Sequence, residues 1–313
     1  MNKIVSAKNK SMKALVTGAT GFLGRHLVRR LEKEGIQVFI STSKVANLKK
    51  VENLYIYNDI KFDYIFHLAI VTKAGDYALH HQGDQWLNNQ LLNTNILQYW
   101  KEHQPQAKMV AMGTSGSYTP GAPMKEENYL IGTPDEGLYT YAMTKRMLLV
   151  GLESIHKQYG LKWLHFIPST LYGPDFELDD NHFIFDFVRN FYNAKHKGEK
   201  VVLWGDGEQR RELIYVDDAI ETMVQLLHKE NETYNLGTGK DNTINEFARI
   251  VGEVYNYDFG LVSHDLSRYV GVREKKLDTT KLSQALSSQP FLNTSLKDGI
   301  RETVKYFVKE IRK

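Results

Sequence analysis

The chain has no cysteine among its 313 residues. A protein without cysteine has no disulfide, no thiolate metal site and no cysteine that could act as a nucleophile or an acid. Long apolar runs are also missing, since none approaches the roughly 20 residues of a membrane-spanning helix, and residues 1–11 lack the apolar segment of a signal peptide. We therefore expect a cytoplasmic protein that has no membrane partner and begins with a flexible leader over residues 1–11.

Neither sign of charge is in large excess. The chain carries 40 lysines and arginines against 37 aspartates and glutamates, a formal net charge of +3. Long basic blocks and alternating basic and aromatic residues, which are typical of nucleic-acid-binding proteins, are absent. We expect no nucleic acid and no metal ion among the ligands. The length is typical of one enzyme-sized unit with two lobes.

Three glycines mark the stretch around which the rest of the chain is organised. Gly18, Gly21 and Gly24 are spaced three apart, after an apolar run at residues 14–16 and before apolar residues at helical spacing. This order of strand, glycine turn and helix is typical of a dinucleotide-binding site, because the glycines permit a tight turn and a close approach to a pyrophosphate. The diphosphate would lie at the amino end of a helix that begins near Phe22. A glycine turn without a ligand is the alternative.

An acidic residue is absent from the end of the second expected strand, residues 36–40. In NAD sites an acidic side chain at this place binds both ribose hydroxyls. Hydroxyl residues from Ser41 onward and Lys44 stand there instead, and Arg25 follows the third glycine, a set that suits a 2′-phosphate. We therefore expect NADP(H) rather than NAD(H). The alternative is that Ser41 starts a loop and that Lys44 is a solvated surface charge.

Strands and helices alternate through the first half of the chain. Further strands are expected at residues 53–57, 63–69, 108–113 and 161–167, and helices at residues 84–103 and 139–159. The first of these helices is expected to place its apolar residues on one face, namely Leu87, Leu91, Leu92, Ile96, Leu97 and Trp100. Asp59 lies in the short connection between two of the strands, where it could bond the adenine edge of a dinucleotide or be solvated.

Beyond residue 167 this alternation breaks down. Helices are expected at residues 182–194, 217–228, 244–255 and after 295, with a short strand at 201–204. The simplest architecture is an α/β fold with a doubly wound parallel sheet of the Rossmann type over residues 12–167, to which segments near residues 213–240 return. A smaller mixed α/β lobe for the substrate would take up most of residues 168–313. We expect the ligands to bind between the two lobes.

A tyrosine and a lysine one helical turn apart carry the chemistry. Tyr141 and Lys145 share one face of the expected helix. A free phenol titrates near about 10, and a nearby ammonium stabilises the phenolate, which suits proton transfer in carbonyl reduction or alcohol oxidation. Thr114, at the end of an expected strand, could hold the substrate oxygen against that phenol. Such a pair is common by chance, but together with the glycine turn it predicts an oxidoreductase.

Motifs along nearly the whole chain share one resemblance. They are TGATGFLG at residues 17–24, HLA at 67–69, the tyrosine and lysine pair, LYGP at 171–174 and YNLGTG at 234–239. On these motifs the chain resembles the extended short-chain dehydrogenases/reductases, the NAD-dependent epimerase/dehydratase group that acts on sugar nucleotides. Within that group it is most similar to the GDP-L-fucose synthases, which are GDP-4-keto-6-deoxy-sugar epimerase/reductases. That likeness rests on Asn89 and Asn95 together with YGLKW, IPSTLYGP, WGDGEQRRELIYVDDA and GVREKKLD.

The resemblance implies a role for individual positions. Thr114, Tyr141 and Lys145 would form a catalytic triad, with Lys145 also holding the nicotinamide ribose. The cofactor-binding set would be Gly18, Thr20, Gly21, Phe22, Leu23, Gly24, Arg25, Ser41, Lys44, Asp59, Leu68, Ala69, Tyr141, Lys145 and Pro168. The substrate-binding set would be Ser115, Gly116, Thr170, Arg189, Trp204, Arg211 and Lys275.

Arg211, and with it Lys275, would bind the diphosphate of the substrate, since a guanidinium is well shaped for bidentate phosphate contact. The alternative is a surface cluster of ion pairs, in which Arg210 and Arg211 are flanked by Glu208 and Glu212.

The sequence departs from its relatives just after Thr114. The related 4,6-dehydratases carry aspartate and glutamate where Ser115 and Gly116 stand, so the acid and base that eliminate water are missing. The fucose synthases carry a cysteine where Gly116 stands, which acts with a histidine to move protons at C3 and C5. His182 matches that histidine, and it is either an acid–base residue or a capping or solvent-exposed one. Thr170 stands where the relatives carry asparagine.

These features together predict the reduction of a 4-keto sugar linked to a nucleoside diphosphate, with GDP favoured, in which hydride passes to C4 and Tyr141 donates the proton. Two alternatives stay open. The first is a C4 epimerase that retains its NAD, and the second is a nucleotide-binding scaffold that has lost turnover. The resemblance also implies a homodimer joined by a four-helix bundle of the helices at residues 84–103 and 139–159.

Overall fold

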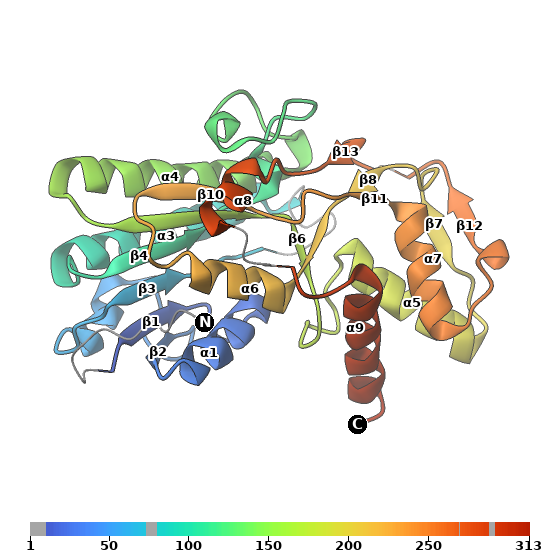
Figure 1. Ribbon diagram of the computed structural model, residues 1–313, viewed down its shortest axis with the longest axis horizontal. Coiled ribbons are helices and arrows are strands. Elements are labelled where there is room, and N and C mark those ends of the chain that lie inside the picture. Colours follow the sequence, from blue (N-terminus) through green and yellow to red (C-terminus); the bar gives the residue numbers. More distant parts are fainter. Residues whose placement is uncertain (1–10, 73–79, 269, 288–291) are drawn as a thin grey trace.

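A six-stranded parallel sheet forms the centre of the protein (Figure 1). The computed structural model describes residues 11–72, 80–268, 270–287 and 292–313. The strands lie in the order β10-β5-β4-β3-β1-β2, and every neighbouring pair is parallel. They are β1 (Lys13–Thr17), β2 (Gln37–Ser41), β3 (Tyr64–His67), β4 (Lys108–Met112), β5 (Trp163–Pro168) and β10 (Glu232–Leu236). The predicted doubly wound α/β fold is confirmed.

Helices cover both faces of this sheet (Figure 1). On one face lie α3 (Gln82–His103) and α4 (Tyr139–Tyr159), and on the other lie α1 (Phe22–Lys33), α6 (Val216–Gln225) and α8 (Thr280–Leu286). Because the strands are buried on both sides, their neighbouring residues enter different cores. Leu15 of β1 belongs to the core under α3 and α4, whereas Val16 belongs to the core under α1 and α6.

The prediction of a strand at residues 53–57 is wrong, because Val51–Tyr57 form a 3-10 helix, η1. Its buried residues Val51, Leu54 and Tyr57 are three apart, so they share one face of a 3-10 helix, which packs against α3. A strand turns alternate residues to opposite faces and could not bury this set together.

The prediction that all apolar residues of α3 share one buried face is wrong near the amino end of the helix. Leu92, Ile96 and Trp100 are buried, but Leu87 is 61% exposed and Leu91 is 42% exposed. Gln85 and Asn89 are buried in the same part of the helix, so Leu87 and Leu91 lie on the opposite face from the one that meets the core.

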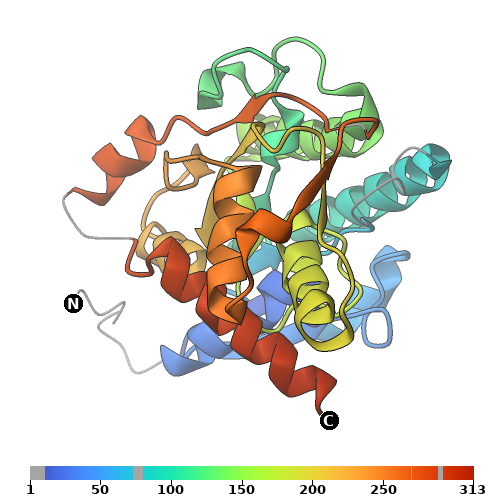
Figure 2. The same cartoon turned by 90° about the vertical axis from the view of Figure 1, so that its right-hand side faces the viewer.

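A second lobe stands beside the sheet, and its three helices pack together around aromatic side chains (Figure 2). These helices are α5 (Phe183–Lys197), α7 (Ile244–Tyr255) and α9 (Leu296–Ile311). The strands of the lobe are short: β7 (Val202–Trp204) pairs with β12 (Ser263–Asp265), and β8 (Arg210–Arg211) lies between β11 (Asn242–Thr243) and β13 (Glu274–Lys275).

The chain passes between the sheet and the lobe through β6 (Thr170–Tyr172) and β9 (Leu213–Tyr215), which pair in parallel. It enters the lobe after β5 and returns through α6 to β10 (Figure 1). Short 3-10 helices interrupt the connections: η2 (Ser115–Ser117), η3 (Glu126–Asn128), η4 (Glu136–Leu138) and η5 (Phe259–Leu261).

Two helices beyond residue 167 differ in length from the prediction, since α5 continues to Lys197 and α6 ends at Gln225. Residues 1–10 of the expected leader lie outside the described residues. Within the described ranges, no helix combines the length and the apolar composition that crossing a membrane requires.

Candidate active site

The glycine turn lies between the carboxyl end of β1 and the start of α1. Gly18 has a φ of +68°, and a Cβ there would lie 2.7 Å from the backbone nitrogen of Ala69, so only glycine fits. A Cβ at Gly24 would lie 2.1 Å from the carbonyl oxygen of Gly18, which lets α1 pack closely on the turn. A Cβ at Gly21 would meet nothing closer than 3.4 Å, so this glycine leaves open space rather than filling a tight contact. The three positions thus fit the three roles of a dinucleotide-binding turn.

The amino end of α1 is left free to bind an anion. Its N-cap residue is Gly21, no side chain caps the helix, and no acidic residue stands in the first turn. The first backbone N–H groups of a helix need an acceptor, and a diphosphate supplies one. The described residues therefore fit a pyrophosphate at this end of the sheet.

A buried polar chain connects the strand ends beneath this turn. Thr17 Oγ1 accepts hydrogen bonds from the backbone N–H groups of Leu68 and Ala69, both at 3.2 Å, and lies 2.9 Å from His67 Nδ1. His67 Nε2 lies 3.0 Å from Asn93 Oδ1, whose amide donates to the carbonyl of Thr144 in α4. Burial, together with the charge of Lys145, lowers the pKa of His67 to about 4, so this ring is neutral.

The three residues expected to carry the chemistry come together at the carboxyl end of β4. Thr114 follows that strand, and its side chain is close enough to Tyr141 to affect the pKa of the phenol. Burial raises the pKa of Tyr141 to about 12, although Thr114 works in the other direction, so the phenol keeps its proton at neutral pH. Lys145 Nζ donates to the carbonyl of Met112 at 2.8 Å, and burial lowers its pKa to about 8. A protonated phenol beside a hydroxyl and an ammonium can deliver a proton to a substrate oxygen.

Arg146 holds the neighbouring turn in place, which the sequence analysis did not foresee. It is buried, and its guanidinium donates to the backbone carbonyls of Ser117, Ile131 and Gly132. These bonds join α4 to the turn η2 after Thr114 and to the long connection that follows. The sequence feature that could indicate this role is a second cation directly after Lys145, on a helix that packs against the sheet.

Four residues of the expected substrate-binding set line one small enclosed cavity at the boundary with the lobe. They are Ser115, Thr170, Arg211 and Lys275, and Met124, Ser169, Glu212 and Leu277 complete the lining. Arg211 of β8 and Lys275 of β13 are direct partners in the strand register. Burial lowers the pKa of Lys275 to about 8, the charge of Arg211 adds to that effect, and Asp135 opposes it. Two cations thus share one wall of the cavity, which suits an anionic ligand.

The structure contradicts the alternative of a surface cluster of ion pairs around Arg210 and Arg211. Arg210 turns to Asp241, which it meets at 2.9 Å, while Arg211 donates to the backbone carbonyls of Arg210 and Val270. Glu212 is buried and bonded to backbone groups.

The residues expected at a 2′-phosphate do not converge. Arg25 donates to the carbonyls of Thr20 and Asp175 and forms an ion pair with Glu177. The hydroxyl of Ser41 donates to the carbonyl of Ala46 at 2.6 Å, and Lys44 is exposed. Arg25 is therefore turned toward the segment after β6 rather than toward Ser41, and Ser41 starts the loop that the alternative interpretation described.

Asp59 lies at the wrong edge of the sheet for contact with a dinucleotide. It is exposed in the connection that leads to the amino end of β3. In this connection the backbone carbonyl of Asp63 accepts from the N–H of Lys108, and the carbonyl of Ile60 accepts from the side chain of Gln104. The glycine turn is at the opposite, carboxyl edge. A strand at residues 53–57 would have brought Asp59 to the carboxyl edge, but this segment is the 3-10 helix η1, and the prediction of a contact between Asp59 and adenine is therefore wrong.

Arg189 and Trp204 are not part of the cavity. The guanidinium of Arg189 bonds to the carbonyl of Leu178, to Asn181 and to Asp186, so it braces the segment before α5. Trp204 is half exposed on β7, with the guanidinium of Arg268 over its ring at 5.2 Å.

His182 precedes α5 and does not cap that helix with its side chain. Its Nδ1 lies 2.6 Å from Asp180 Oδ1, and the side chain is 48% exposed. Burial works against its protonation, but the hydrogen bond and the charge of Asp180 outweigh it, so the pKa of His182 lies above its usual value. Phe185, which stacks edge-on against His182, also contacts Phe22 at the start of α1, so this pair faces the region of the glycine turn.

The other expected cofactor residues lie along the carboxyl edge of the sheet. Thr20 and Leu23 belong to the glycine turn and the first turn of α1, Leu68 and Ala69 follow β3, and Pro168 ends β5. Asn89 and Asn95, by contrast, hold backbone: Asn89 bonds to both backbone groups of Val71, and Asn95 donates to the carbonyl of Leu48.

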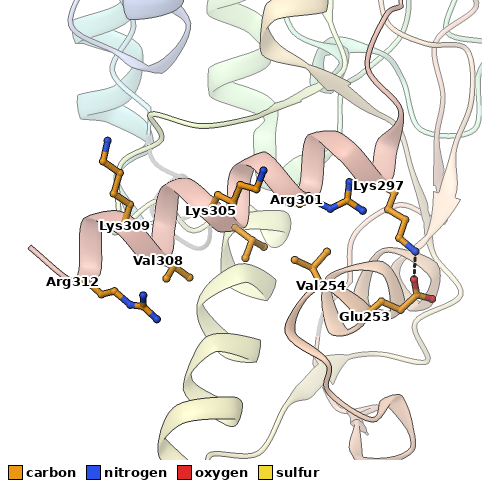
Figure 3. Close-up of a pocket in the computed structure, with 9 residues that line it drawn as sticks. Glu253, Val254, Lys297, Arg301, Lys305, Val308, Lys309 and Arg312 are labelled. Carbon is orange, nitrogen blue, oxygen red and sulfur yellow. Dashed lines mark hydrogen bonds and ion pairs between the residues drawn. The ribbon is translucent and has the colours of Figure 1, made fainter.

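A larger hollow lies elsewhere, between α7 and α9 (Figure 3). Val254, Val304 and Val308 line it together with basic side chains of α9, and Lys297 forms an ion pair with Glu253 at its rim. No residue of the expected cofactor or substrate sets lines this groove.

A dinucleotide turn, a threonine–tyrosine–lysine group and a cationic cavity at the carboxyl edge of one parallel sheet are the features of an NAD(P)-dependent enzyme of the epimerase/reductase type. The NAD dependent epimerase/dehydratase family matches residues 14–237, and the chain belongs to that family. The resemblance that the motifs indicated is thus confirmed.

Individual relatives are similar along almost the whole chain. GDP-L-fucose synthase 1 of Arabidopsis thaliana is 28% identical over 319 residues, which cover 99% of this chain and 97% of the relative. The GDP-mannoheptose C4 reductase from Campylobacter jejuni with NADP bound has a TM-score of 0.83 at 23% identity, covering 95% of this chain and 98% of that one. The UDP-glucose 4-epimerase of Thermotoga maritima has a TM-score of 0.83 at 27% identity, covering 96% and 100%.

Proposed function

We propose that this protein reduces the 4-keto group of a nucleoside diphosphate sugar, with a GDP-sugar as the favoured substrate and NADPH as the favoured reductant. The observation that supports the proposal is the arrangement of the three residues: Thr114 directly follows β4, and Tyr141 and Lys145 lie one turn apart on α4, where Lys145 Nζ donates to the carbonyl of Met112 at the end of β4. The names of the relatives, a GDP-L-fucose synthase and a GDP-mannoheptose C4 reductase, support a GDP-sugar.

The glycine turn and the amino end of α1 would hold NADPH, which would supply the hydride for C4 of the sugar. The phenol of Tyr141 gives its proton to the C4 oxygen as that oxygen gains charge, so the carbonyl becomes an alcohol. The hydroxyl of Thr114 bonds the same oxygen and fixes it against the phenol. Lys145 stabilises the phenolate that remains until a proton returns from solvent.

The diphosphate of the substrate would bind to Arg211 and Lys275. Their place in register on β8 and β13 supports this role, since two cations on one cavity wall match two phosphate groups. Ser115 and Thr170, in the same cavity, would supply hydroxyls to the sugar.

Position 116 supports a reductase that does not epimerise C3 or C5. Glycine has no group that can take or give a proton, and His182, half exposed and paired with Asp180, has no cysteine partner in a chain without cysteine. We therefore propose that the chain carries out the reduction alone, on a sugar whose C3 and C5 configuration is already set.

NADP(H) is favoured because no acidic residue ends β2, where Ser41 stands. The exposed Lys44 in the loop after β2 is the cation that remains for a 2′-phosphate, because Arg25 is engaged elsewhere. We expect a preference for NADPH over NADH of about tenfold, the size of one charge-assisted hydrogen bond.

The test uses the purified protein with GDP-4-keto-6-deoxymannose and NADPH, and it follows NADPH absorbance and the product by NMR in D2O. Stoichiometric loss of NADPH with no deuterium at C3 or C5 supports the proposal. Inversion at C4 of an alcohol substrate without net NADPH loss would instead show a C4 epimerase. Nucleotide binding without either reaction would show a scaffold.

We also propose a homodimer through α3 and α4. Apolar side chains of these two helices lie exposed on the outside of the sheet domain, namely Trp86, Leu87 and Leu91 on α3 and Met147 and Tyr159 on α4. α3 and α4 pack side by side (Figure 1), so two copies could form a four-helix bundle that buries these residues. Light scattering after size exclusion should give twice the 36.1 kDa chain mass, and Leu87→Glu should give the monomer.

A further inference from the structure

Glu212 is a buried carboxylate that bonds almost entirely to backbone. It is only 3% exposed and follows Arg211 in the chain. Its Oε1 accepts hydrogen bonds from the N–H groups of Thr238 at 2.5 Å and Gly239 at 2.8 Å, and from the Thr238 hydroxyl at 3.3 Å. Its Oε2 accepts from the N–H of Leu277 at 2.7 Å.

These donors favour an ionised carboxylate. Both oxygens accept hydrogen bonds from backbone N–H groups, which stabilise the charged form. Burial raises the pKa of Glu212, while its backbone bonds to Leu277, Gly239 and Thr238 work against that rise. Backbone N–H groups of Thr238, Gly239 and Leu277 thus surround this carboxylate.

The bonds of Glu212 join segments that are far apart in the sequence. Thr238 and Gly239 follow β10, the strand that returns to the main sheet, and Leu277 lies two residues beyond Lys275 of β13. The carbonyl of Glu212 also accepts from the backbone N–H of Thr170 at 3.3 Å. The turn after β10, β6, β8 and β13 thus meet at one residue, and its carboxylate joins β13 to the turn after β10.

These same segments carry the cationic cavity. Arg211, Thr170, Lys275 and Leu277 line it together with Glu212. β8 and β13 are only two residues long each, so their own ladder bonds are too few to fix the spacing of Arg211 and Lys275. The carboxylate cannot itself bind a diphosphate, because like charges repel and its lone pairs face donors already.

We propose that Glu212 is a positioning residue, which sets the separation of Arg211 and Lys275 by fastening β13 and the turn after β10 to β8. The inference rests on the proposed function in one respect: the ligand between the two cations is the diphosphate of a nucleotide sugar.

The first measurement is hydrogen exchange in the free protein, which needs no catalysis. In Glu212→Gln, an amide NH2 replaces one acceptor and faces an N–H donor, so the N–H groups on that side, either Leu277 or Thr238 with Gly239, should exchange about tenfold faster, the effect of losing one net hydrogen bond. The matched control is Glu208→Gln, since Glu208 is exposed in the same segment and bonds to the side chain of Asn245. Unchanged exchange at the three amides in Glu212→Gln would overturn the proposal.

The second measurement is the affinity for GDP by calorimetry, joined to steady-state kinetics. Glu212→Gln should weaken GDP binding and raise the KM for the sugar nucleotide by about tenfold, with kcat and the KM for NADPH within twofold of the parent. A loss of kcat and of cofactor affinity in equal measure would indicate general disruption and would overturn a positioning role.

A second variant covers the case in which Glu212→Gln does not fold. Glu212→Asp keeps the charge but is one methylene shorter, so it can reach either the turn at Thr238 or Leu277, but not both. Exchange should accelerate on one side only, with an intermediate loss of GDP affinity, and full parental affinity would overturn the proposal. If wild type bound GDP and both effects appeared, but no 4-keto sugar were reduced, the positioning role would stand and the reductase assignment alone would fall.

Discussion

The two walls of the site are built in different ways. Tyr141 and Lys145 lie on α4, a helix of 21 residues, and Thr114 directly follows a buried strand of the main sheet. Arg211 and Lys275 lie on strands of two residues each. A long helix fixes its side chains through its own backbone ladder, whereas a two-residue strand depends on bonds from elsewhere. The reacting groups are thus positioned by secondary structure, and the binding groups by a buried charge.

The largest expected effect comes from the wall that holds Thr114, Tyr141 and Lys145, which we call the catalytic wall. Tyr141→Phe removes the proton donor while leaving the ring in place, so the rate of reduction should fall by about a thousandfold, within the range of general acid catalysis. Stopped-flow or steady-state measurement of NADPH oxidation at saturating substrate gives this number.

The control for Tyr141→Phe is its unchanged affinity for GDP and NADPH, because α4 should keep its shape without one hydroxyl. A variant as active as the parent would mean that another group donates the proton. A variant that lost nucleotide affinity in proportion to its rate would mean that the two walls are not independent.

The next largest effect comes from the wall that holds Arg211 and Lys275, which we call the substrate wall. Arg211→Met removes a guanidinium from the cavity and should raise the KM for the sugar nucleotide by about ten- to a hundredfold, the value of one or two charge-assisted hydrogen bonds. The kcat should change far less, because Tyr141 and Thr114 are held by other elements.

Arg210→Met is the matched control for Arg211→Met. Arg210 stands next to it on β8 but pairs with Asp241, away from the cavity. Equal effects of the two substitutions on KM would contradict the assignment of the diphosphate to Arg211.

The pH dependence of reduction should reflect one lysine on each wall, Lys145 and Lys275. Burial lowers the pKa of Lys145 to about 8, and burial with the nearby Arg211 lowers the pKa of Lys275 to about 8. Both groups carry their charge below that pH, so kcat and substrate affinity should each decline as the pH rises through about 8. A bound diphosphate should shift the decline in affinity to higher pH, because an anion stabilises the ammonium of Lys275.

Stability should respond to pH in the opposite sense. A lysine whose pKa is lower in the folded state binds fewer protons there than in the unfolded chain, between about pH 8 and the unperturbed value near 10.4. The free energy of unfolding should therefore gain a favourable contribution from Lys145 as the pH rises across that window. Lys145→Met should remove this contribution, as measured by denaturant titration at several pH values.

The same contrast explains what could be predicted from the sequence. The glycine turn, the strand and helix order and the helix that carries Tyr141 depend on local periodicity, which a single sequence displays. Those elements were placed to within a few residues. The exception, η1, is buried with a period of three, which is easily taken for a strand in a short apolar run.

The substrate wall could be predicted only by resemblance. Arg211 and Lys275 are separated by more than sixty residues and meet through a pairing of two-residue strands, which leaves no periodic trace. The resemblance implied a substrate-binding role for Arg211 and Lys275, which do line one cavity. It implied the same role for Arg189 and Trp204, whose side chains bind other partners. The sequence indicates no more than a surface charge for Glu212, because nothing in a sequence shows that a carboxylate will be held by distant backbone N–H groups.

The smallest expected effect is that of Gly116→Ala, which we compare with Gly24→Ala in the cofactor turn. At Gly116 a Cβ would lie 3.0 Å from Leu138 Cδ1, the flexible end of a side chain, so Gly116→Ala should change the free energy of unfolding by less than about 1 kcal/mol. At Gly24 a Cβ would lie 2.1 Å from the backbone oxygen of Gly18, which cannot move without opening the turn, so Gly24→Ala should cost about 3 kcal/mol. Thermal unfolding of both variants, with reduction rates measured alongside, tests this difference.

If Gly116→Ala kept its stability and its activity, packing would not require glycine at position 116. A large destabilisation by Gly116→Ala would instead mean that the turn after Thr114 requires glycine for its shape, and the argument from position 116 to a reductase without C3 or C5 epimerisation would lose its structural support.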